Sequence, residues 1–198
     1  QPGRKIFALL PGSRQSELQY HARTFVKTAR CIAGRFPEAQ FLVPLVSRET
    51  RILFEAAQYD AQAQDLPITL LFGHAREAIA AADAVLVASG TATLEAALYR
   101  IPMVITYRMS PTSWRLMSRM RYQPWIGLPN IIAGQFLVPE ILQDQATPEN
   151  LAQALVNVSL DPAIQRNLPE RFASMHELLR RNASERAADV AMPWLQNP

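Results

Sequence analysis

Cysteine and long hydrophobic runs are scarce in this sequence. Its 198 residues contain a single cysteine, which excludes a disulfide scaffold and a metal site built from several cysteines. No stretch approaches the roughly 18 consecutive apolar residues of a membrane-spanning helix. The opening residues Gln1–Lys5 lead directly into a short apolar strand, so we expect no signal peptide. The first residue is not methionine, and we therefore expect a piece of a longer protein.

Acidic residues are missing from a long central interval. No Asp or Glu lies between Glu95 and Glu140, although the whole chain has a formal charge of only +3. The same interval contains five arginines, which are Arg100, Arg108, Arg115, Arg119 and Arg121. Such a basic window attracts phosphate groups, whether of a nucleotide, a nucleic acid or an anionic membrane surface.

The first half of the chain alternates between apolar runs and segments of helical spacing. Hydrophobic residues make up 49% of the sequence, which is typical of a folded protein. The pattern predicts strands at Ile6–Leu10, Gln40–Val46, Ile68–Phe72, Ala84–Ala88 and Met103–Thr106. It predicts intervening helices at Glu17–Phe36, Glu49–Ala61, Ala75–Ala82 and Thr91–Tyr99. Continuously apolar strands separated by helices indicate an α/β fold, with a Rossmann-like parallel sheet flanked by helices.

The second half of the chain has a different pattern. Pro111–Met120 reads as a helix, residues 123–139 as a loop, and the remainder as an all-helical C-terminal tail. Thr147 and Asp161 each precede a proline, as helix N-caps do, and Ser184 is a third expected cap. We expect a Rossmann-like lobe over residues 1–145. The C-terminal helices of residues 146–198 would either pack on that lobe or cross to another one.

Two predicted strand ends carry residues suited to phosphate. The first strand leads into Gly12, Ser13 and Arg14, which supply a tight turn, a hydroxyl group and a guanidinium fork. The fourth leads into Ser89–Thr93 at a helix start, where small residues expose backbone N–H groups near the positive end of the helix dipole. Glu95 follows within one turn, where its carboxylate can accept hydrogen bonds from a ribose diol. Each turn alone could be an ordinary strand-to-helix connection, and Glu95 an ordinary first-turn acid.

Five segments, in a fixed order, resemble one enzyme family. They are Leu9–Arg14 with Glu17 after it, Ser89–Leu98, Pro102–Arg108, Leu128–Asn130 and Pro139–Gln143. This series of segments is similar to the lipid-A-disaccharide synthases. The similarity covers the whole of this chain but only the C-terminal half of the proteins of that family. The resemblance implies one lobe of a GT-B glycosyltransferase fold. It also implies transfer of 2,3-diacylglucosamine from its UDP derivative to lipid X (2,3-diacylglucosamine 1-phosphate), giving lipid A disaccharide and UDP.

The resemblance also implies roles for individual residues. Arg14 and Ser13 would face the diphosphate, and Glu95 would hold the ribose. The helix start around Ser89, Gly90, Thr91 and Thr93 would cradle the diphosphate. The residues implied for the uracil pocket are Phe72 and His74, although His74 also reads as a solvated turn residue. Asn130, Glu140 and Gln143 would close the site around the sugar, or would simply hold a loop and start a helix.

Other implications concern partners and chemistry. We expect no metal and no cofactor, because the sequence has no Asp-x-Asp motif and its three histidines are scattered. The general base is expected on a missing N-terminal lobe, supplied by a second polypeptide or a homodimer partner, so this chain alone would be nearly inactive. Lipid X and UDP-diacylglucosamine are the implied substrates, at the cytoplasmic face of the inner membrane.

Several alternatives remain open from the sequence. The chain could belong to another GT-B enzyme that uses UDP-GlcNAc, such as a peptidoglycan transferase or a 2-epimerase, or could be a non-catalytic nucleotide-binding lobe. The Arg-, Met- and Trp-rich segment from Pro111 to Trp125 has three interpretations. It could be a helix on an anionic membrane surface, a nucleic-acid surface, or a helix that packs on the sheet with solvated arginines. We expect no nucleic-acid partner.

Overall fold

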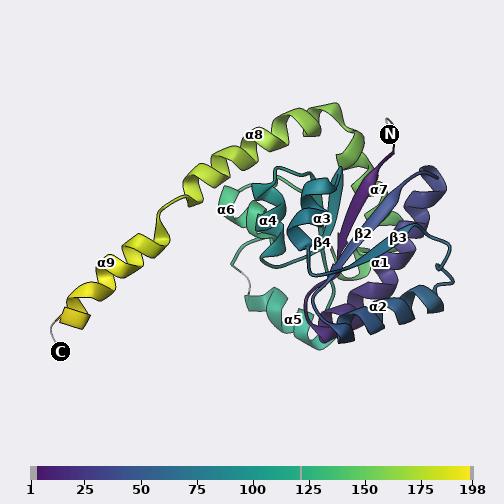
Figure 1. Ribbon diagram of the computed structural model, residues 1–198, viewed down its shortest axis with the longest axis horizontal. Helices are drawn as coiled ribbons and strands as arrows, with labels where there is room; N and C mark the ends of the chain where they lie inside the picture. Colours follow the sequence, from purple (N-terminus) through teal and green to yellow (C-terminus); the bar gives the residue numbers. More distant parts are fainter. Residues whose placement is uncertain (1–3, 121, 197–198) are drawn as a thin grey trace.

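A computed structural model describes residues 4–120 and 122–196. It contains one six-stranded parallel sheet with helices on both faces (Figure 1). The strand order is β3-β2-β1-β4-β5-β6, which is that of a doubly wound Rossmann-type sheet. The strands are β1 (Ile6–Leu10), β2 (Gln40–Leu45), β3 (Ile68–Phe72), β4 (Ala84–Ala88), β5 (Met103–Tyr107) and β6 (Glu140–Leu142). The predicted α/β fold class is confirmed.

Alternating side chains of β1 supply two cores, one on each face of the sheet. Phe7 and Leu9 pack with helices α1 (Gln15–Arg35), α2 (Arg48–Asp60) and α7 (Pro148–Leu160). Ala8 and Leu10 pack with α3 (Ala75–Ala81), α4 (Ala92–Leu98) and α8 (Pro162–Leu179). All five residues of β4 are buried. A strand covered on both faces needs apolar residues at every position, which explains the continuous apolar runs of the sequence.

The structure differs from the prediction in the interval expected to be a loop. Residues 128–133 form a short helix, α6 (Leu128–Ala133). Pro129 lies in its first turn, where proline is tolerated, and Gly134 ends it in the left-handed conformation. These residues therefore mark the two ends of a helix. Strand β6 was not predicted because three residues are too few to show a pattern, and its place is set by pairing with β5.

The helical tail begins as predicted but its last cap is different. Thr147 Oγ1 accepts a hydrogen bond from the Asn150 N–H at 3.2 Å, and Asp161 Oδ1 accepts one from the Ala163 N–H at 2.7 Å. Both predicted caps are confirmed. The prediction of Ser184 as a cap is wrong, because α9 (Ala183–Gln196) begins before it and the carbonyl of Asn182 accepts the first helical hydrogen bond.

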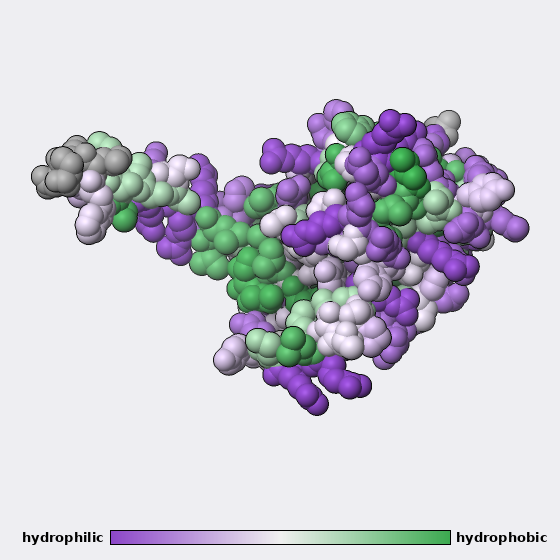
Figure 2. Space-filling model, turned by 90° about the horizontal axis from the view of Figure 1, so that it is seen from below, coloured by the Kyte–Doolittle hydropathy of each residue, from purple (hydrophilic) through white to green (hydrophobic). Residues whose placement is uncertain are grey.

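The tail extends away from the body of the molecule. Helix α9 projects from the end of α8 (Figure 1), and Trp194 on it is 81% exposed. Hydrophobic side chains gather where the projecting helices leave the body (Figure 2). No helix in the described ranges is both long and apolar enough to cross a membrane.

Candidate functional site

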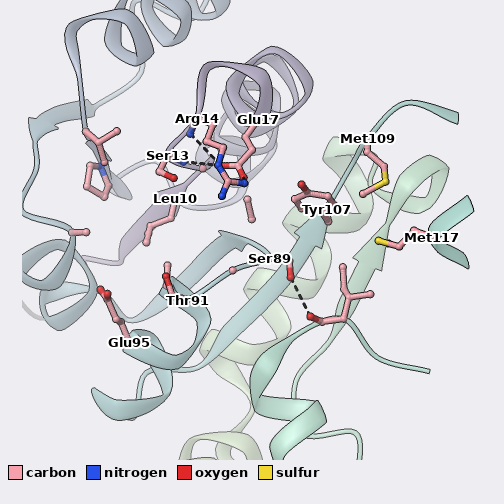
Figure 3. A pocket seen from close by; sticks show the side chains of 18 residues that line it. Leu10, Ser13, Arg14, Glu17, Ser89, Thr91, Glu95, Tyr107, Met109 and Met117 are labelled. Atoms are coloured by element: carbon pink, nitrogen blue, oxygen red, sulfur yellow. Dashed lines mark hydrogen bonds and ion pairs between the residues drawn. The ribbon is translucent and has the colours of Figure 1, made fainter. Parts of the chain in front are cut away.

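A cleft of about 630 Å³ opens at the carboxyl ends of the strands (Figure 3). It lies between the turns that follow β1 and β4, which are neighbours in the sheet. The chain continues outward from this pair in opposite directions, so this is the point where strand order reverses. Ligands of open α/β sheets bind at this point. The sheet thus brings together the two turns that the sequence singled out.

The turn after β1 is shaped by Glu17. Its carboxylate accepts hydrogen bonds from the N–H groups of Ser13 at 2.8 Å and Arg14 at 3.2 Å, and it lies 3.3 Å from Arg14 Nη1. A Cβ atom on Gly12 would lie only 2.5 Å from a Glu17 carboxylate oxygen, and the φ of Gly12 is +118°. Glycine is therefore required at this position. The N–H groups of Ser13 and Arg14 are therefore already used. The side chains that the turn offers the cleft are the Ser13 hydroxyl and the Arg14 guanidinium, and the Arg14 side chain is 77% exposed.

The turn after β4 offers backbone donors instead. The N–H groups of Gly90, Thr91 and Ala92 have no acceptor within the part of the chain that the structure describes. Gly90 has a φ of +153°, a conformation that side-chain-bearing residues rarely adopt. Buried Thr93 donates its hydroxyl to the Gly90 carbonyl at 2.7 Å. Thr93 therefore supports the turn from behind and does not line the cleft.

Glu95 lies on the same side of the cleft as Thr91. Figure 3 shows both across the cleft from Ser13 and Arg14. No side-chain hydrogen bond or ion pair engages the Glu95 carboxylate among the described residues. A half-buried carboxylate with unused acceptor sites can bind a ligand that carries two neighbouring hydroxyl groups.

A third wall of the cleft is apolar and was not predicted. It comprises Tyr107 at the end of β5, Met109, Met117 of α5 (Pro111–Met120) and Ile126. Ile126 is held from both sides, because its carbonyl accepts the Ser89 hydroxyl at 3.2 Å and its N–H donates to Glu140 at 2.8 Å. The sequence did show these apolar residues in the basic window, but without tertiary contacts they could not be assigned to the cleft.

Helix α5 buries none of its residues. Leu116 and Met120 are 63% and 67% exposed, so the interpretation of α5 as a helix that packs on the sheet is wrong. Arg115 and Arg119 are exposed on the same helix. Arg121 and the opening residues Gln1–Gly3 lie outside the described residues.

Two predicted uracil-pocket residues lie beside the cleft and do not line it. Phe72 ends β3 and is largely exposed. His74 has a φ of +55°, and its exposed ring lies 3.4 Å from Glu77. The cleft wall in this region comes from Pro44, Val46 and Ala75, so any contact from residues 72–74 would be at the rim.

The three residues expected near the sugar hold the loop behind the apolar wall. Glu140 accepts hydrogen bonds from the N–H groups of Ile126 and Gly127 at 2.8 and 2.9 Å. Fully buried Asn130 donates to Glu140 at 2.8 Å. With its amide oriented to satisfy both atoms, Gln143 pairs with the backbone N–H and carbonyl of Met109 at 3.2 Å each. None of the three lines the cleft.

A buried histidine that no motif indicated lies below the rim. The Arg108 N–H donates to His21 Nε2 at 2.9 Å, so the ring proton is on Nδ1, which donates to the Pro11 carbonyl at 3.0 Å. Burial lowers the pKa of His21 below its ordinary value of 6.5. The sequence contained no signal for this contact, because its two partners are 10 and 87 residues away.

Comparison with known proteins gives one consistent result. A family model described as lipid-A-disaccharide synthetase matches residues 1–191. The lipid-A-disaccharide synthase of Azoarcus sp. (strain BH72) is 55% identical over 196 residues, which are 99% of this chain and 50% of that protein. That of Dechloromonas aromatica (strain RCB) is 58% identical over 191 residues, again 50% of its length. The chain thus spans about half the length of the curated relatives it matches.

Solved structures show the same fold at low sequence identity. The calicheamicin glycosyltransferase CalG4 matches with a TM-score of 0.59 and 18% identity, over 100% of this chain and 43% of that one. The UDP-GlcNAc 2-epimerase of Neisseria meningitidis, solved with UDP-GlcNAc, matches with a TM-score of 0.56 and 13% identity. The match covers 92% of this chain and 46% of that one. The C-terminal CMP-Kdo binding domain of WaaA from Acinetobacter baumannii matches with a TM-score of 0.56 and 12% identity, over 91% of both chains. These likenesses show that the fold is one lobe of the GT-B type.

Proposed function

Because this chain belongs to the lipid-A-disaccharide synthetase family, we propose that it is the donor-binding half of a glycosyltransferase of lipid A biosynthesis. In the proposed reaction, 2,3-diacylglucosamine passes from its UDP derivative to lipid X, giving lipid A disaccharide and UDP. The observation that carries the proposal is the cleft itself. The Arg14 guanidinium lies on one side of it, and on the other lie the N–H groups of Gly90, Thr91 and Ala92, which have no acceptor among the described residues. Beside them is the Glu95 carboxylate, which has no side-chain partner in the same part of the chain.

The proposed binding mode follows from the chemistry of these groups. The diphosphate would lie between Arg14 and the N–H groups of Gly90, Thr91 and Ala92, because both sides supply donors to phosphate oxygens. The two ribose hydroxyls would donate to Glu95. Negative charge accumulates on UDP as it leaves the sugar, and donors already in place stabilise that charge in the transition state. Ser13 would add one hydroxyl on the Arg14 side.

The other half of the enzyme would supply the acceptor site and the general base. The exposed apolar residues of α8 and α9, Trp194 among them, suit helices that cross to a second lobe. A second polypeptide or a second copy of the chain could provide it. We therefore propose that this chain alone binds the nucleotide but forms the disaccharide slowly. This proposal is wrong if the chain alone forms the disaccharide as fast as an enzyme with both lobes does.

Glu95→Ala should weaken UDP binding about ten-fold or more, because two hydrogen bonds to a charged acceptor are lost together. Titration calorimetry of this chain with UDP measures the effect. Glu38→Ala is the matched control, since exposed Glu38 lies at the opposite ends of the strands, ahead of β2. Equal affinity in both variants would remove Glu95 from the site. No heat with the parent would support a non-catalytic lobe instead.

We further propose that α5 docks the protein on an anionic membrane. The surface of α5 combines exposed Leu116 and Met120 with exposed Arg115 and Arg119. Apolar side chains insert among acyl chains while arginines pair with lipid phosphates. Met117 of the same helix lines the cleft. A diacylated substrate could therefore pass from the membrane to the site beside α5.

The double variant Leu116→Ser, Met120→Ser should bind vesicles about ten-fold less than the parent, because two partly inserted side chains are lost. Flotation with phosphatidylglycerol-containing vesicles at low salt measures binding. Ile52→Ser is the matched control, since Ile52 is an exposed apolar residue of α2. The membrane proposal is wrong if the parent does not float, or if Ile52→Ser has an equal effect.

A further inference from the structure

His21 connects two segments that the sheet itself does not join. Pro11 follows β1 and Arg108 follows β5, and β4 lies between these strands in the sheet. No backbone pairing can therefore link the two strand ends directly. The imidazole spans the distance with one hydrogen bond to each, at 3.0 and 2.9 Å.

Both connected segments continue directly into walls of the cleft. Pro11 leads to Gly12, Ser13 and Arg14, and Arg108 lies between the wall residues Tyr107 and Met109. The ring is 2% exposed. It packs between the rings of Phe25 and Tyr107, with centroids 6.0 and 5.4 Å away. The surroundings thus hold the imidazole in one orientation between the two walls.

We propose that His21 is a positioning residue that holds the Arg14 turn and the apolar wall at the separation the donor nucleotide requires, and that it does so only while its ring is uncharged. This inference rests on the proposed function of the cleft. His21 itself does not line the cleft, so its effect on binding is exerted through Pro11, Arg108 and the Tyr107 ring.

The charged form of the ring is incompatible with the observed contacts. In the observed structure Nε2 accepts a hydrogen bond from the Arg108 N–H. Protonation would put a hydrogen on Nε2, so that two donors would face each other. Burial is the largest influence lowering the pKa of His21, and the nearby Arg108 charge acts in the same direction. The Pro11 carbonyl and the Glu17 carboxylate oppose them, and the Tyr107 phenol ring completes the surroundings. As the pH falls, His21 therefore becomes protonated at a higher pH in the unfolded chain than in the folded one. The free energy of unfolding accordingly decreases as the pH drops below about 6.5.

The test compares His21→Phe with Ile32→Ala. Phenylalanine keeps a ring of similar shape but removes both hydrogen bonds and the titration. Ile32 is a buried residue of the same helix, eleven residues beyond His21, and makes neither bond. The ligand is UDP-N-acetylglucosamine, whose diphosphate is esterified at both ends and does not titrate near neutral pH. Calorimetry gives its affinity at several pH values, and nitrogen-15 NMR gives the protonation state of the His21 ring.

We expect His21→Phe to bind about ten-fold more weakly at neutral pH, because two hydrogen bonds that fix the walls are lost. Ile32→Ala should unfold at a lower temperature yet bind as the parent does. The parent's affinity should fall with the same midpoint as ring protonation, and that dependence should vanish in His21→Phe. Equal binding by parent and His21→Phe, a persisting pH dependence, or a neutral ring protonated on Nε2 would overturn the positioning role. Absence of binding by the parent would instead overturn the proposed function and this inference together.

Discussion

Replacing Arg14 with alanine should weaken UDP binding by roughly ten- to a hundred-fold, which corresponds to ~1.5–3 kcal/mol for hydrogen bonds to a charged group. Arg14 is the charged donor on its side of the cleft, and the N–H groups of Ser13 and Arg14 are already bound to Glu17. A diphosphate that loses the guanidinium therefore keeps only the Ser13 hydroxyl among the side-chain donors of this turn. Titration calorimetry of the purified chain measures the loss.

The Arg14 effect can be separated from a change in folding. The guanidinium is largely exposed, and its ion pair within the described residues is with Glu17, at 3.3 Å. Such exposed pairs contribute little to stability. The melting temperature of Arg14→Ala should thus stay close to that of the parent. Arg23→Ala is the matched control, because Arg23 is an exposed arginine of α1, the helix that follows Arg14, and lies outside the cleft. Equal losses in the two variants would indicate a general charge effect and contradict the assignment of Arg14.

Asn130→Ala should lower the free energy of unfolding by about 3 kcal/mol or more, since each buried partner left unsatisfied costs roughly 1–3 kcal/mol. Asn130 Oδ1 accepts the N–H groups of Leu137 and Val138 at 2.7 and 3.0 Å. Its Nδ2 donates to the Val138 carbonyl at 2.9 Å and to Glu140 at 2.8 Å. Alanine would leave the N–H and carbonyl of buried Val138 without this partner and would remove one bond each from half-buried Leu137 and Glu140. Urea unfolding followed by circular dichroism measures the change.

The control for Asn130 is an exposed asparagine. Asn167→Ala on α8 should change stability by less than about 0.5 kcal/mol, as surface substitutions do. A folded Asn130→Ala protein of unchanged stability that had lost donor affinity would contradict the loop-holding role. That result would restore the role near the sugar that the family resemblance implies.

The sheet was predictable from the sequence because its central strands, such as β1 and β4, are buried on both faces. Runs such as Ala84–Ala88 contain only apolar residues, and each is followed by turn residues and a helix start. The two phosphate-friendly turns were predictable for the same reason, since parallel strands end at one edge of the sheet. What the residues alone did not supply was the strand order that places these turns side by side.

The parts that could not be predicted depend on contacts distant in sequence. Strand β6 exists because Glu140 and Leu142 pair with Ile105 and Tyr107. The role of Glu140 in binding the backbone at Ile126 and Gly127 likewise leaves no local pattern. His21 looks like an ordinary residue of an amphipathic helix until Arg108 is brought to it by the fold. Tertiary contacts of this kind are decided by packing and not by local propensity.

The most direct test of the account is a crystal structure of this chain with UDP bound. We predict that the diphosphate lies between the Arg14 guanidinium and the N–H groups of Gly90–Ala92, with both ribose hydroxyls on the Glu95 carboxylate. A nucleotide bound elsewhere, or a diphosphate that touches neither turn, would contradict the account.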